Sequence, residues 1–220
     1  MNKPLSALLV AGVPLFLAAA YGGWAVVTVE DLPDHAVVGT PLPLEFLVRQ
    51  HGITLLEGLH PRIEARLGEQ LVSAAAVAGK DPGRYAGTVS LPTPGDWTIT
   101  IHSGFGPSRV TLMPIEVVAA GAKPSRVVVE SERGRRLFVA KGCASCHVHG
   151  GVQATTLADV GPELTHKRYE ADYLTQFLAN PAIAASRPGT FKMPNLGLKQ
   201  GEIASLVAFI NANRQAASGQ

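Results

Sequence analysis

The chain has 220 residues, which is enough for two small domains, and 46% hydrophobic with 16% charged residues allows an ordered core. Its net charge of +2 is unevenly spread, because residues 30–122 carry ten acidic and six basic side chains whereas residues 127–220 carry ten basic and seven acidic ones. So small a surplus, with no run of five or more like charges, excludes the clustered positive charge that nucleic-acid binding needs.

The first segment of interest, residues 5–29, has no charged side chain. As a helix its 25 residues are long enough to cross a bilayer core of about 30 Å. Lys3 precedes it and three acidic residues follow within residues 30–34, so the positive-inside rule places the remainder of the chain outside. We expect residues 1–29 to be a single transmembrane helix in a bacterial inner membrane, with the rest periplasmic. A cleaved signal peptide is the alternative, because residues 18–20 are alanines that resemble a cleavage site.

The next segment, residues 30–118, alternates apolar and polar side chains with a period of two, as half-buried strands do. Turn-forming residues at 92–96 separate two such runs. About seven short strands in this length predict an immunoglobulin-like antiparallel β-sandwich. The parity of the apolar residues changes near Pro114, so we expect a bulge or an edge position there.

Two short stretches of this segment, residues 83–87 (Gly-Arg-Tyr-Ala-Gly) and 94–99 (Pro-Gly-Asp-Trp-Thr-Ile), carry a loose resemblance. With an anchor before them they are similar to periplasmic YtkA-like and FixH-like domains. The resemblance implies association with membrane respiratory complexes or with the assembly of metal centres.

Copper binding by the sandwich is an alternative role, because four histidines and a methionine lie in it: His35, His51, His60, His102 and Met113. Their spacing matches no ligand pattern. The chain has only two cysteines, both further on, so a thiolate-ligated copper centre in the sandwich is excluded.

Residues 119–130 are a predicted linker of small residues with a proline.

The most informative motif of the chain is Cys-Ala-Ser-Cys-His at residues 143–147. Two thiols at this spacing can form thioethers to the two vinyl groups of a haem, while the adjacent His147 reaches the iron. A zinc site or a surface redox pair would fit the cysteines alone. Zinc needs a second ligand pair, and Cys143 and Cys146 are the only cysteines.

Around this motif, residues 131–213 resemble class I cytochrome c in four features taken in order. These are a helix start at 134–138 running into Lys141-Gly142, the attachment motif, Gly-Pro-Glu-Leu at 161–164, and Lys-Met-Pro at 192–194 before a closing helix at 200–211. The resemblance implies an all-α cytochrome c domain over residues 131–220 with one covalent haem c. It also implies that the Pro162 carbonyl orients His147.

Met193 is the predicted distal ligand, because it is the only methionine of the helical region and lies 46 residues after His147. His166 is the chief competitor for that position. We assign no function to His166 or His149, and we expect Phe138 and Phe209 to pack between the first and last helices.

The sequence therefore predicts a membrane-anchored periplasmic monohaem cytochrome that carries electrons and is not an enzyme. It would act as a subunit of a respiratory or photosynthetic complex, with a quinol-oxidising complex, a terminal oxidase or a reaction centre as partner and with no small-molecule substrate. An oxidase assembly or copper-delivery factor with an auxiliary haem is the alternative, and gas sensing or catalysis would require an open iron position. Five basic residues flank the expected haem crevice and could dock an acidic partner: Arg133, Arg135, Arg136, Lys141 and Lys192.

Overall fold

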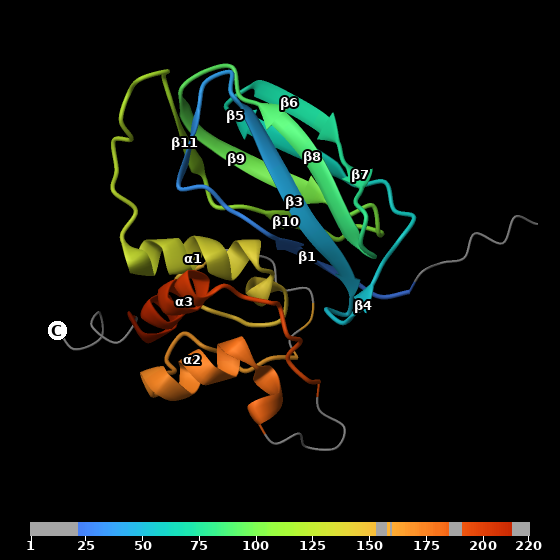
Figure 1. Ribbon diagram of the computed structural model, residues 1–220, viewed down its shortest axis with the longest axis vertical. Coiled ribbons are helices and arrows are strands. Elements are labelled where there is room, and N and C mark those ends of the chain that lie inside the picture. Colours follow the sequence, from blue (N-terminus) through green and yellow to red (C-terminus); the bar gives the residue numbers. More distant parts are fainter. Residues whose placement is uncertain (1–21, 153–157, 159, 185–190, 213–220) are drawn as a thin grey trace, which may run out of the picture.

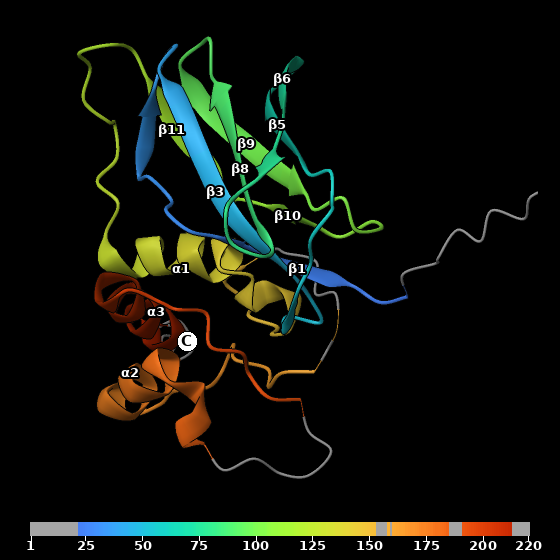
Figure 2. The same ribbon diagram turned by 45° about the vertical axis from the view of Figure 1, so that its right-hand side comes forward.

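The computed structural model describes residues 22–152, 158, 160–184 and 191–212, which form a two-sheet β region and a helical region beside it (Figure 1). The β region spans residues 25–118, and the helices follow residue 129. Seen from a second direction, α1 is still the helix nearest the sheets and α2 the farthest (Figure 2). The helices thus meet the sandwich along one side.

One sheet is built around a long strand and is antiparallel throughout. Its members are β1 (Ala25–Val29), β3 (Pro41–Gln50), β8 (Arg84–Ser90), β7 (Val77–Ala78) and β4 (Thr54–Leu55). In β3 the residues Leu42, Leu44, Phe46 and Val48 alternate into the core, as their period of two predicts. Stacked rings of Phe46 and Tyr85, with centroids 6.0 Å apart, join β3 to β8.

The second sheet is centred on β9, whose Trp97, Ile99 and Ile101 are fully buried. Its members are β2 (His35–Val37), β11 (Ile115–Val118), β9 (Gly95–His102), β5 (Arg62–Leu67), β6 (Gln70–Ala75) and β10 (Arg109–Thr111). The β2–β11 pair alone is parallel among these. Both β10 and β11 pair with β9, and the break between them at residues 112–114 is the irregularity expected near Pro114.

The predicted membrane helix is wrong, because part of it is strand β1. All five residues of β1 are buried, with Ala25, Val27 and Val29 in the sandwich core. β1 is the edge strand of its sheet, and α1 packs against it, so both of its faces are covered. Burial on both faces explains the uncharged, β-branched sequence equally well. Among the described residues no helix combines the length and apolarity needed to cross a bilayer, and residues 1–21 lie outside them.

The described residues of the helical region form three α-helices and two single turns. These are α1 (Glu130–Ala140), η1 (Cys143–Ser145), α2 (Ala171–Ala179), η2 (Pro181–Ile183) and α3 (Gln200–Ala212). α1 and α3 cross in close contact, with Phe138 and Phe209 edge to face at 5.6 Å between ring centroids. Both phenylalanines are buried, as predicted.

Polar contacts join the two regions at the end of α1. The Lys141 ammonium donates to the Glu30 carbonyl at 2.5 Å, and the Thr28 hydroxyl donates to the Lys141 carbonyl at 3.4 Å. Lys141 also forms an ion pair with Glu202 of α3 at 2.7 Å. One buried side chain therefore links the start of the sandwich, the end of α1 and the start of α3.

Candidate haem site

A cavity of about 610 Å³ opens among the helices, within the range of roughly 300–1,000 Å³ typical of cofactor sites. All five site residues that the sequence predicted line it, although they come from three separate segments: Cys143, Cys146, His147, Pro162 and Met193. The remaining wall is mostly apolar, with Leu174, Leu178 and Ile210 supplied by α2 and α3.

The end of α1 positions the two cysteines. Gly142 has a left-handed backbone (φ 81°) that ends the helix and turns the chain into η1. A Cβ at Gly142 would lie 2.3 Å from Cγ1 of Val26, so only glycine fits between the turn and the sandwich. The Cys143 carbonyl then accepts hydrogen bonds from the amides of Cys146 and His147, at 3.1 and 2.9 Å. One tight turn thereby brings both sulfurs and the imidazole to the cavity.

The environment of the two thiols favours an uncharged covalent bond at sulfur over a thiolate. Both cysteines are free, and burial raises the pKa of Cys143 to about 12 and raises that of Cys146 as well. An uncharged thioether fits this environment better than a thiolate or a thiolate-bound metal would. The pair therefore matches the attachment of a haem rather than a zinc ion.

His147 is held in one tautomer by Pro162. Its Nδ1 lies 2.9 Å from the Pro162 carbonyl, which can only accept, so Nδ1 carries the proton and Nε2 keeps its lone pair. Burial lowers the pKa of His147, which favours the neutral imidazole that a metal requires. Gly161 packs against the ring, since a Cβ there would lie 2.5 Å from Cε1 and Nδ1. This carbonyl-to-imidazole contact is the orienting geometry that iron-ligating histidines use.

Met193 lies in the segment before α3, and it packs against the helical core while lining the same cavity as His147. His166 and His149 do not line that cavity. His149 is only 2% exposed, and its ring lies tilted against the rings of Phe138 and Phe209, with ring centroids 5.5 and 4.2 Å away. This burial could not be predicted from the sequence, because a histidine in a loop has no periodicity.

Residues 131–213 match the family model of cytochrome c. This part of the chain is a cytochrome c domain. Such a domain carries covalently attached haem c and acts as an electron carrier. The free thiols, the single-tautomer imidazole and the apolar cavity described above fit that group.

The search of curated proteins found no match. Among solved structures, the chain is similar to trypsin-activated α2-macroglobulin from Escherichia coli at 17% identity and a TM-score of 0.36, over 42% of this chain and only 6% of that one. It is similar to superoxide reductase (neelaredoxin) from Ignicoccus hospitalis at 18% identity and a TM-score of 0.27, over 42% and 79% of the two chains. These similarities are too weak to carry any functional argument.

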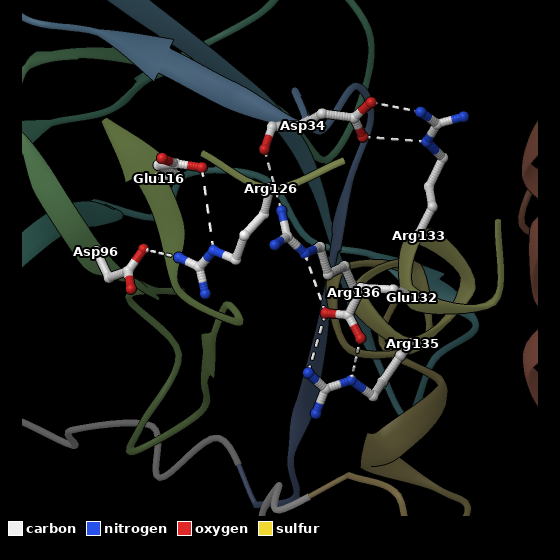
Figure 3. Close-up of polar contacts among 8 residues, drawn as sticks. All are labelled: Asp34, Asp96, Glu116, Arg126, Glu132, Arg133, Arg135 and Arg136. Atoms are coloured by element: carbon white, nitrogen blue, oxygen red, sulfur yellow. Dashed lines mark hydrogen bonds and ion pairs between the residues drawn. The ribbon is translucent and has the colours of Figure 1, made fainter. Parts of the chain in front are cut away.

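Of the five basic residues expected to flank the haem crevice, only Lys141 and Lys192 line the cavity. Lys141 and the three arginines are engaged within the chain, and Figure 3 shows the contacts of the arginines. Arg133 pairs with the Asp34 carboxylate, which raises the pKa of Arg133, and Arg136 donates to the Asp34 carbonyl at 3.1 Å. Arg135 pairs with Glu132 at 2.7 Å and lowers the pKa of that carboxyl. Lys141 is buried, whereas Lys192 is exposed. Balancing these charges inside the chain weakens the prediction that they dock an acidic partner.

The histidines suggested as copper ligands lie on separate elements of the sandwich and do not form a cluster. His35 lies on β2, His51 in the turn after β3, His60 in a loop and His102 at the end of β9. Within the described part of the chain, no three histidine, cysteine or acidic side chains lie close enough to hold a metal ion. His51 instead lines the haem cavity together with Val26 and Gly52, a contribution from the sandwich that the sequence did not predict.

Proposed function

We propose that this protein is a monohaem c-type cytochrome that accepts and donates single electrons. The observation that carries the proposal is that both thiols, the Nδ1-protonated His147 and Met193 surround one apolar cavity. Cys143 and Cys146 would hold haem c by thioethers, and His147 and Met193 would be the ligands of its iron. The bound haem supplies the ferric–ferrous couple.

The chain's own residues set the conditions of that transfer. The apolar wall excludes water, which favours the less charged ferrous state, and the soft thioether of Met193 favours it further. Pro162 fixes the His147 ring so that it does not reorient when the charge changes.

We also propose that the protein works on the periplasmic side of the bacterial inner membrane, because attachment of haem through thioethers takes place on exported chains. The partner would be an electron-transfer complex of that membrane: a quinol-oxidising complex, a terminal oxidase or a reaction centre. The fused sandwich supports a bound subunit over a diffusing shuttle, since it adds a second surface by which the protein can be held. Copurification from native membranes with identification of the associated subunits would test this assignment.

Replacing Met193 with alanine should remove the weak red-edge charge-transfer band of the ferric protein, lower the reduction potential and let carbon monoxide bind the ferrous protein. The reason is loss of the thioether sulfur from the iron. Met113→Ala is the matched control, because Met113 is the other described methionine and lies in the sandwich between β10 and β11. Absence of the band from the wild-type protein, or its survival in Met193→Ala, would refute Met193 as the ligand.

A further inference from the structure

The segment that carries Met193 is held by the sandwich at three successive places. Phe191, two residues before Met193, packs on Trp24 with ring centroids 6.4 Å apart. Pro194, the residue after it, lies over Gly52, where a Cβ would be 3.7 Å from the proline Cγ. Further along, the Lys199 ammonium meets the Asp31 carboxylate at 2.5 Å. Residues of the sandwich therefore contact this segment both before and after Met193.

The sandwich side of this contact is rigid. Trp24 directly precedes β1, and its carbonyl accepts the His51 amide at 2.9 Å, which continues the β1–β3 pairing by one residue. The rings of Trp24 and His51 meet edge to face at 5.5 Å. His51 adopts a left-handed backbone (φ 52°), and Gly52 follows with φ 74°, so the turn that presents Gly52 has a fixed shape. Trp24 and Gly52 are thus two points on one hydrogen-bonded strand end.

The helical region gives the same segment less support. Met193 and Leu198 pack against the helical core, but Phe191 is 48% exposed and its ring contact is with the sandwich. The described side-chain hydrogen bonds of residues 195–199 within the helical region are short-range, from Gly197 to Asn195 and from Lys199 to Glu202. A segment with few contacts of its own opens at a low free-energy cost unless a neighbour holds it.

We propose that the sandwich braces the Met193 segment, and that the contact between Trp24 and Phe191 sets how often the Met193 sulfur leaves the iron. This inference rests on the proposed function, because it takes Met193 as the distal ligand. Trp24 is then a positioning residue that acts on the iron through Phe191. Loss of the contact raises the population of the open segment without changing any group that touches the haem iron.

Imidazole binding to the ferric protein measures this population, because imidazole takes the position that Met193 vacates. An aromatic pair of this kind is worth roughly 0.5–1.5 kcal/mol, so Trp24→Ala should raise the imidazole affinity by about twofold to tenfold. Phe191→Ala should give a similar rise, and it removes the contact from the exposed side without opening the sandwich core. Trp24→Phe keeps an aromatic ring and should restore most of the wild-type affinity.

Two further variants separate the brace from general destabilisation. Val89→Ala truncates a buried side chain of β8 in the sandwich core, and it should leave the imidazole affinity unchanged. The double variant Trp24→Ala/Phe191→Ala should bind imidazole no more tightly than the stronger single variant, because both remove one contact.

The wild-type ferric spectrum separates failure of this inference from failure of the proposed function. If the charge-transfer band is present and Trp24→Ala binds imidazole with wild-type affinity, the brace is overturned while the haem ligands stand. If Val89→Ala raises the affinity as much as Trp24→Ala does, the brace is likewise overturned. Absence of the band from the wild-type protein overturns Met193 ligation, and the brace with it.

Discussion

Gly134→Ala should lower the free energy of unfolding by about 3 kcal/mol or more, although alanine is the better helix former. Gly134 lies in α1 where α3 crosses it, and a Cβ there would be 1.9 Å from the Ser205 carbonyl oxygen and 2.7 Å from Cβ of Phe209. The first of these atoms belongs to a helix backbone, so the two helices must separate. Separation would also loosen the Phe138–Phe209 contact beside the cavity.

Chemical denaturation of the haem-loaded protein measures this loss, and Gly201→Ala is its matched control. Gly201 lies in the first turn of α3, where a Cβ would meet nothing within 4 Å. The same substitution there should stabilise the protein by about 0.5 kcal/mol through helix propensity alone. Equal effects at the two glycines would show that the close helix crossing does not limit stability.

That the five candidate residues would lie around one cavity could be predicted from the sequence, because their signals are local. The two thiols and His147 follow one another within a single turn, and Pro162 and Met193 stand in short motifs of fixed order. The closing helix could be predicted in the same way: it is expected at 200–211 and spans Gln200–Ala212 in the structure. In each of these cases the residues that determine the local structure lie close together in the sequence.

The errors arose where contacts are distant in sequence. An uncharged run is consistent with a lipid environment and with a strand buried on both faces, and β1 is the latter because α1 covers its outer side. The ion pair between Arg133 and Asp34 was not foreseen either, because Asp34 lies 99 residues earlier in the sequence. The sandwich wall of the cavity depends on the register of β1 and β3, which no local pattern encodes.

Lys141→Met should also cost about 3 kcal/mol of unfolding free energy, because it leaves a buried carboxylate without its cation. The Lys141 side chain is 5% exposed and that of its partner Glu202 is 13% exposed. Glu202 would keep only the Lys199 amide, at 2.9 Å, and the Glu30 carbonyl would lose the Lys141 ammonium. The double variant Lys141→Met/Glu202→Met should recover most of the loss, since a buried pair replaced by apolar side chains is close to neutral.

Lys199 offers a control for this pair, because it joins the same two regions through Asp31 but its side chain is 61% exposed. Solvent and salt screen an exposed pair, so Lys199→Met should cost far less than Lys141→Met. Urea denaturation of the three haem-loaded variants and the wild type gives all of these values. Lys141 directly precedes Gly142 and Cys143, so its loss should also loosen the attachment turn from the sandwich. Equal costs for the two lysine variants would mean that the buried ion pair does not hold the two regions together.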